Sequence, residues 1–124
     1  MKVIQTNNTA QPLGHYSQAI VSNGLIFISG QLGIDIKNPD YVPDTVTEQT
    51  KVTLKNLKAV LEASNSSIEK VVKTTIFISD VKYWAEVNKV YAEFFGSHKP
   101  ARSAVPTRDL PKGFLVEIEA IATT

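Results

Sequence analysis

The sequence predicts a single α+β domain, residues 1–124, in which a twisted mixed β-sheet carries two helices on one face. Apolar side chains recur at helical spacing over residues 46–63 and again over residues 84–95, which predicts two amphipathic helices. Apolar residues alternate with period two over residues 114–122, which predicts a strand with one buried face. The complete predicted order is strand, strand, strand, helix, strand, helix, strand, strand.

Composition describes an ordinary globular protein. The 124 residues are 43% hydrophobic and 20% charged, and the net charge of +1 gives no electrostatic reason to expect nucleic acid or a membrane as partner. The absence of cysteine excludes disulfides, a thiol nucleophile and a cysteine-rich zinc site. No apolar run approaches the ~18 residues of a membrane span, and no signal-peptide pattern is present, so we expect a cytoplasmic protein.

Neither a metal site nor a cofactor is expected. The two histidines, His15 and His98, are far apart in the sequence, and no phosphate-binding loop or dinucleotide fingerprint is present. Ser29 lacks the context of a nucleophile elbow and has no histidine or carboxylate at a suitable spacing, which argues against acyl-enzyme chemistry. Any chemistry must therefore proceed without a cofactor.

Three strands are expected before the first helix, at residues 2–6, 17–21 and 25–29. An Asn-Gly pair between the second and the third strand is a strong signal of a tight hairpin. Gly30 follows the third strand, and it allows either a close approach of the backbone to a ligand or a β-bulge.

The first helix has a clear start signal. Thr45 and Glu48 have the spacing of a capping box, so we expect the helix to cover residues 46–63. Another strand is expected at residues 69–79, where apolar residues alternate.

The second helix can be capped by Ser79 or Asp80, and Gly96 suits its C-terminal end. Its apolar stripe is best explained by core packing. Asn88 is a polar residue at the edge of this stripe, where it could satisfy backbone groups or face a site. The stripe consists of Trp84, Val87, Val90, Tyr91, Phe94 and Phe95.

The second face of the last strand is unusual because Glu117 and Glu119 share it with Leu115 and Ile121. Two carboxylates among large aliphatic side chains indicate partial burial. Because the helices leave this face of the sheet uncovered, we expect it to pack against other subunits.

Arg102 is the preferred candidate for binding a carboxylate, since its planar fork can donate two hydrogen bonds and small residues around it would leave room for a ligand. Arg108 is expected to pair locally with Asp109. A structural salt bridge from Arg102 to Glu117 or Glu119 is an equally well supported alternative.

Glu117 and Glu119 are also candidate general bases, because an apolar setting raises the pKa of a carboxyl group towards useful values. The alternative is that both are strand charges satisfied by their neighbours. Tyr16 could offer its hydroxyl to a pocket, although a tyrosine bonded to backbone groups is the commoner case.

Several ordered motifs resemble the RidA/YjgF family of enamine/imine deaminases, and together they cover nearly the whole chain. They are Gly14-His15-Tyr16-Ser17-Gln18-Ala19, Ser29-Gly30-Gln31, Asn56-Leu57-Lys58-Ala59-Val60-Leu61, Val87-Asn88 with Val90-Tyr91 and Phe94-Phe95, Lys99-Pro100-Ala101-Arg102-Ser103, and Glu117-Ile118-Glu119-Ala120-Ile121-Ala122.

The resemblance implies a chorismate-mutase-like α+β fold and a homotrimer around a central β-barrel, with sites in the clefts between subunits. It implies hydrolysis of 2-aminoacrylate and related 2-imino acids to 2-keto acids and ammonia. The family's residues match Arg102 for the substrate carboxylate and Glu117 for the water, which leaves Glu119 a structural or interfacial charge. The pocket residues match Tyr16, Ser29, Gly30 and Asn88.

Two positions depart from the family pattern. His15 stands where many members have proline, and it can reshape the entry loop or face solvent. Ala104 stands where many members have cysteine, but imine hydrolysis needs no thiol. The competing function is a non-catalytic regulator that binds a 2-keto or amino acid in the same cleft, whereas RNA cleavage finds little support in a near-neutral chain.

Overall fold

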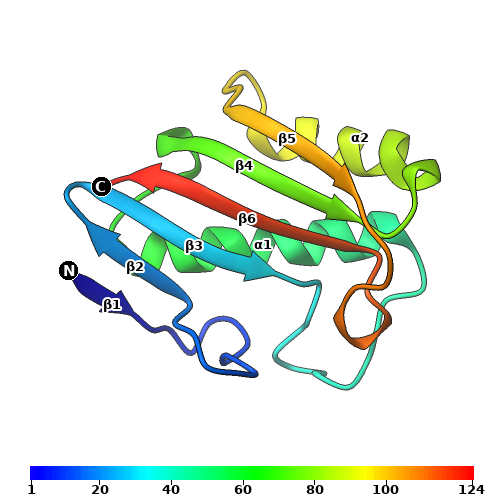
Figure 1. Cartoon of the computed structure of the whole chain (residues 1–124), viewed down its shortest axis with the longest axis horizontal. Coiled ribbons are helices and arrows are strands. Elements are labelled where there is room, and N and C mark those ends of the chain that lie inside the picture. Colours follow the sequence, from blue (N-terminus) through cyan, green and yellow to red (C-terminus); the bar gives the residue numbers. More distant parts are fainter.

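A computed structural model describes all residues from Met1 to Thr124. It contains a six-stranded sheet in the order β1-β2-β3-β6-β4-β5, with two α-helices (Figure 1). Only β4 and β5 pair in parallel, and every other pair is antiparallel. The bounds are β1 Lys2–Ile4, β2 Ala19–Ser22, β3 Leu25–Gln31, α1 Val46–Ala63, β4 Val71–Ile78, α2 Trp84–Phe95, β5 Ala101–Pro106 and β6 Val116–Thr123.

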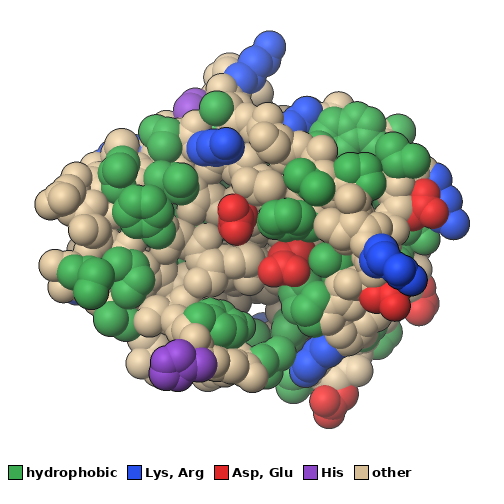
Figure 2. All heavy atoms as spheres, viewed as in Figure 1, with side chains coloured by type: hydrophobic (Ala, Val, Ile, Leu, Met, Phe, Trp, Pro, Cys, Tyr) green, Lys and Arg blue, Asp and Glu red, His purple; other side chains and the backbone are tan.

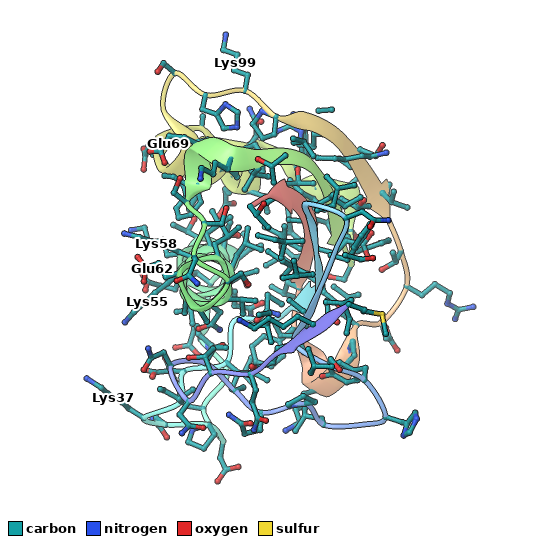
Figure 3. The ribbon with its side chains drawn as sticks, turned by 90° about the vertical axis from the view of Figure 1, so that its left-hand side faces the viewer. Lys37, Lys55, Lys58, Glu62, Glu69 and Lys99 are labelled. Atoms are coloured by element: carbon teal, nitrogen blue, oxygen red, sulfur yellow. The ribbon has the colours of Figure 1, made fainter.

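Both helices cover one face of the sheet, so the predicted α+β class and the predicted order of elements are confirmed (Figure 1). Figure 3 shows α1 beside the sheet, with Lys55, Lys58 and Glu62 pointing away from it. The opposite stripe of α1 packs on the strands and includes Leu54, Leu57 and Leu61, all at most 1% exposed.

Helix α1 begins where the capping pattern predicts. The Thr45 side chain accepts a hydrogen bond from the Glu48 backbone N–H at 3.1 Å, which satisfies one of the free amides of the first turn. The helix ends at Ala63, as predicted, and the Ser64 N–H bonds back to the Val60 carbonyl at 3.1 Å.

Strand β4 is shorter than the strand predicted at residues 69–79. Residues Ile68–Lys70 form a 3₁₀ turn, so β4 begins at Val71, and Val81–Tyr83 form another before α2. The Asp80 carboxylate caps this second turn by accepting from the Lys82 N–H at 2.9 Å. At the other end of α2, Gly96 has the positive φ of 62° that the glycine predicts.

The predicted hairpin between β2 and β3 is confirmed, because its turn residues Asn23 and Gly24 have φ values of 51° and 75°. Strand β1 stops at Ile4, two residues before the predicted end. Beyond this point the backbone of Thr6 bonds to a side chain instead of a neighbouring strand. The Gln18 amide accepts from the Thr6 N–H at 2.7 Å and donates to the Thr6 carbonyl at 3.1 Å.

Two buried polar side chains of α1 fix the segment between β3 and α1 and the start of β6. The Gln49 amide donates to the Pro43 carbonyl at 2.9 Å and accepts from the Leu115 N–H at 2.7 Å. The Asn56 amide donates to the carbonyls of Leu32 and Ile34, both at 2.9 Å. Buried amides of this kind hold irregular backbone in one conformation because their loss would leave carbonyls unsatisfied.

The other face of the sheet has no helix on it. In β6, the core side chains of Val116, Ile118, Ala120 and Ala122 are buried, as the alternation predicts. On the uncovered face, Phe27 pairs with Ile121 across β3 and β6 and remains 44% exposed. Figure 2 looks onto this face and shows hydrophobic side chains gathered over it with acidic side chains between them. No helix of the chain is both long and apolar enough to cross a membrane.

Candidate functional site

Arg102 lies on β5, at the edge of the sheet, and points towards the helices. It stands opposite Thr74 in the parallel ladder with β4, and Thr74 is a fully buried residue of the helix-covered face. The Arg102 guanidinium donates to the side-chain oxygen of Asn88 on α2 at 3.0 Å. Asn88 therefore faces the candidate site rather than the backbone of its own helix.

No carboxylate pairs with Arg102 in the chain. The two ion pairs are Lys51 with Glu48 and Lys58 with Glu62, both on the exposed side of α1. The alternative of a salt bridge from Arg102 to an acid of β6 is thus not formed. The prediction that Arg108 pairs with Asp109 is wrong, because this stretch is exposed and the two side chains do not meet.

Two aromatic rings, rather than an acid, contact the Arg102 guanidinium. The Arg102 Cζ atom lies 4.7 Å from the ring centroid of Trp84 and 4.8 Å from that of Tyr91, both within the range of a cation–π interaction. Arg102 and Asn88 line a cavity of about 370 Å³, together with Tyr91 and His98 among others. The His98 ring is held by a 2.7 Å hydrogen bond to the Val71 carbonyl.

Glu117 lies on the opposite face of the sheet. In β6 it pairs with Phe77 of β4, and its neighbours Val116 and Ile118 point into the helix-covered core. Burial raises the pKa of the half-buried Glu117 carboxyl, and the nearby charge of Glu119 raises it further. A carboxyl group with a raised pKa holds a proton more readily than an exposed one, which suits it to accept and return a proton.

Gly30 makes room for this carboxylate. It lies in the bulge of β3 between Ile28 and Gln31, where the register against β6 shifts. A side chain at Gly30 would collide with Glu117, since a Cβ atom there would lie 2.9 Å from the Glu117 carboxyl carbon. The predicted bulge is therefore confirmed, and the group that comes close to Gly30 is a side chain of the same chain rather than a ligand.

Ser29 and Tyr16 lie around the same bulge. The Ser29 hydroxyl donates to the Ser17 carbonyl at 2.6 Å, which ties the bulge to the segment that follows Tyr16. Tyr16 and Gly30 line one small cavity of about 40 Å³. The Tyr16 ring is 51% exposed, and its hydroxyl accepts from the Leu13 N–H at 3.2 Å, so its side chain is available to a ligand or to a second chain.

The six candidate residues thus form two groups in one chain. Arg102 and Asn88 lie on the helix-covered face at the β5 edge, whereas Glu117 lies with Gly30, Ser29 and Tyr16 around the β3 bulge. Strand β6 is two strands from β5, roughly 10 Å at normal strand spacing. Arg102 pairs with Thr74 of β4, and Glu117 pairs with Phe77 of the same strand. These two partners are three residues apart, which adds a separation of about 10 Å along the strand direction.

The two positions that depart from the family pattern are both exposed. His15 lies in the loop before β2 and makes no hydrogen bond within the chain, which agrees with the alternative that it faces solvent. Ala104 lies on β5 opposite Ile76, on the same face as Arg102. A side chain larger than alanine at this position would therefore stand beside the guanidinium.

Sequence reasoning missed the rings that contact Arg102. Trp84 and Tyr91 belong to a stripe that predicts core packing, and Tyr91 is indeed 6% exposed. The available signal was the spacing, since Trp84, Asn88 and Tyr91 follow one another at i, i+4 and i+7 and so share one side of α2.

Residues 6–124 match the sequence family described as endoribonuclease L-PSP. The chain is 47% identical over 121 residues to a RutC family protein of Pyrococcus horikoshii, covering 98% of this chain and 96% of the relative. It is 41% identical over 121 residues to the 2-iminobutanoate/2-iminopropanoate deaminase of Rattus norvegicus, covering 98% and 88%. The crystal structure of E. coli TdcF with bound serine matches with a TM-score of 0.95 at 35% identity, covering 100% of this chain and 99% of that chain.

These similarities extend over nearly the full length of the chain and agree with the motifs quoted above. The chain therefore belongs to the endoribonuclease L-PSP family, which is the RidA/YjgF family.

Proposed function

We propose that this protein hydrolyses 2-aminoacrylate and related 2-imino acids to 2-keto acids and ammonia. The observation that carries the proposal is the state of Arg102: a guanidinium fixed by an amide and two rings, with no acid to neutralise it, on the wall of a cavity. Such a group is prepared to bind a planar carboxylate through two charge-assisted hydrogen bonds. The sequence similarity to a 2-iminobutanoate/2-iminopropanoate deaminase supports the same activity.

The reaction needs only positioning and proton transfer. Arg102 binds the substrate carboxylate, and Glu117 holds a water molecule beside C2 of the protonated imine. The water oxygen bonds to C2 as Glu117 accepts its proton, which gives a tetrahedral carbinolamine. Glu117 returns a proton to the nitrogen, the C2–N bond breaks and ammonia leaves with the bonding electron pair, while the carbinol hydroxyl gives its proton to Glu117 and becomes the carbonyl of the 2-keto acid. The raised pKa of Glu117 suits these transfers.

The site is proposed to be shared between two chains of a homotrimer. Arg102 and Glu117 of one chain lie on opposite faces of the sheet, separated by more than the length of a three- or four-carbon acid. The Arg102 group of one chain and the Glu117 group of a neighbour can instead meet across a subunit cleft. The uncovered sheet face, with Phe27 and Val3 exposed, supports association through this face.

Sedimentation tests the assembly. A stable trimer at micromolar concentration is expected, and a monomer under these conditions would remove the shared site and with it the proposed mechanism.

The activity is tested with freshly generated 2-aminoacrylate, by following pyruvate and ammonia. The wild-type chain is expected to release both faster than buffer alone. A rate equal to the buffer blank, with a properly folded trimer, would contradict the enzyme proposal.

A second candidate function is a regulator that binds a small 2-keto or amino acid without turnover. Serine bound in the related E. coli TdcF structure favours this candidate, because serine is a stable amino acid rather than an imine. The single tryptophan, Trp84, lies against Arg102 and can report binding by fluorescence. Saturable binding of 2-ketobutyrate without any deaminase activity would favour the regulator.

RNA cleavage is not proposed, despite the description of the family. The net charge of +1 offers little to a phosphate backbone, since binding strength there depends on clustered Lys and Arg.

A further inference from the structure

One side of α2 holds Arg102 through three groups. Trp84, Asn88 and Tyr91 lie at i, i+4 and i+7 along the helix, and the guanidinium of Arg102 contacts all three. The contacts are two ring faces and one neutral amide. None of them cancels the positive charge, whereas an acid in the same place would compete with the carboxylate of a ligand.

The Tyr91 ring is itself anchored to the sheet. Its hydroxyl is 2.7 Å from the Thr74 hydroxyl, and Thr74 is fully buried on β4 directly opposite Arg102. Phe95, one turn further along α2, packs on Tyr91, with the two ring centroids 4.6 Å apart. Tyr91 therefore gives the guanidinium a surface that cannot move without breaking buried contacts.

An arginine in this position needs such support. Every residue of β5 is exposed, and β5 is an edge strand paired on one side only. A free arginine side chain has rotamer entropy, which a ligand would have to overcome when it orders the guanidinium. Ordering the side chain in advance removes that cost from ligand binding.

We propose that Trp84 and Tyr91 are positioning residues that order the Arg102 guanidinium before a ligand arrives, and that Thr74 anchors Tyr91 for this purpose. The inference rests on the proposed function only for the class of ligand, a planar 2-imino or 2-keto carboxylate. The ordering itself is a property of the free protein.

The first test measures side-chain motion in the free protein. The chain has two arginines, so the Nε–Hε region of a ¹⁵N spectrum holds two signals, assigned by Arg102→Lys. The heteronuclear NOE of Arg102 is expected to approach that of the rigid backbone, whereas the exposed Arg108 serves as a mobile internal reference. The Trp84→Leu and Thr74→Val variants are expected to lower the Arg102 value towards that of Arg108.

Two variants serve as matched controls. Trp84→Phe keeps a ring beside the guanidinium and is expected to keep the wild-type NOE. Phe94→Leu makes the same aromatic-to-aliphatic change on α2, but Phe94 packs on Phe95 and lines a different cavity with Lys51 and Leu54. It is expected to leave Arg102 unchanged. If Trp84→Leu does not fold, Thr74→Val still decides the question, because an unchanged Arg102 signal in that variant would contradict the anchoring of Tyr91.

The second test measures binding of 2-ketobutyrate by calorimetry, which needs no turnover. Trp84→Leu is expected to weaken binding about threefold to thirtyfold, and Phe94→Leu by less than about twofold. An Arg102 signal as mobile as Arg108 in the wild type, or an unchanged signal in Trp84→Leu, would overturn the inference. Absence of deaminase activity with an ordered Arg102 would instead contradict the proposed function and leave this inference standing.

Discussion

Arg102 and Glu117 lie on opposite faces of the sheet, although only β4 separates their strands. Arg102 is paired with the buried Thr74 of β4 and faces α2. Glu117 is paired with Phe77 of β4 and lies on the uncovered face. One chain therefore holds the two halves of the proposed site apart. This relationship determines which experiments test the proposed function.

Replacing Arg102 by lysine should remove most of the activity although the charge is kept. Lysine cannot reproduce the planar fork, and each lost charge-assisted hydrogen bond costs about 1.5–3 kcal/mol, so kcat/KM is expected to fall about tenfold to a hundredfold or more. Initial rates with 2-iminobutanoate check this. Arg108→Lys is the matched control, since Arg108 is exposed and contacts none of the site residues. Equal activity of Arg102→Lys and wild type would contradict the role of a carboxylate clamp.

Glu117→Gln should lower kcat/KM about 100-fold to 10,000-fold, because the amide cannot accept the proton of the water. The same variant should be at least as stable as the wild type at neutral pH. Burial, and then the charge of Glu119, raise the pKa of the Glu117 carboxyl above its ordinary value of 4.5, so the folded state disfavours the ionised form.

The direction of the pH dependence follows from this shift. The favourable contribution of protonated Glu117 is complete below pH 4.5 and is lost as the pH rises through the higher folded-state pKa. The wild type should therefore lose stability relative to Glu117→Gln over that interval. Denaturant midpoints of the wild type and of Glu117→Gln, measured from acid to neutral pH, check this loss of stability. A Glu117→Gln variant that is less stable than the wild type at neutral pH would contradict the prediction.

Glu119→Gln should move the pH dependence of the reaction to lower pH. Glu119 is the second cause of the raised pKa of Glu117, and removing a like charge makes the carboxyl easier to ionise. The rise of kcat/KM with pH should shift accordingly. Glu62→Gln makes the same charge change on the outer side of α1 and should leave the profile in place (Figure 3). An identical shift in both variants would indicate a general effect of net charge instead.

Gly30→Ala should destabilise the chain through its contact with Glu117. The new Cβ atom would collide with the Glu117 carboxyl, so the side chain or the bulge must move. Glu117→Asp shortens the side chain and should reduce the cost of Gly30→Ala. Unfolding midpoints of the two single variants and the double variant measure this coupling, and strictly additive effects would show that the two residues do not interact.

The sequence is sufficient to predict the elements whose local chemistry is unambiguous. The Asn23-Gly24 turn, the Thr45 cap and the alternation along β6 are all confirmed, because turn geometry, capping and side-chain period act over a few residues. The end of β1 could not be predicted. It depends on the Gln18 amide, which is far along the chain and takes the backbone groups of Thr6.

The candidate site was predictable as a set of residues but not as an arrangement. Residues 101–106 show no apolar alternation, and all are exposed, so nothing local indicates which face Arg102 occupies. The parallel register with β4 decides it. The contacts of Arg102 with Trp84 and Tyr91 depend in turn on where α2 crosses β5, which is a property of the whole fold. The roles of the six candidate residues stay predictions until variants are measured.

The most direct test of the central claim mixes two inactive variants. Arg102→Ala and Glu117→Gln chains are unfolded, combined in equal amounts and refolded together. In a cyclic trimer whose sites each take Arg102 from one chain and Glu117 from its neighbour, random assembly leaves one intact site in four, so about a quarter of the wild-type activity should return. Each variant refolded alone should stay inactive. Mixed trimers that form, as shown by two distinguishable tags, but remain as inactive as the single variants would contradict a site shared between chains.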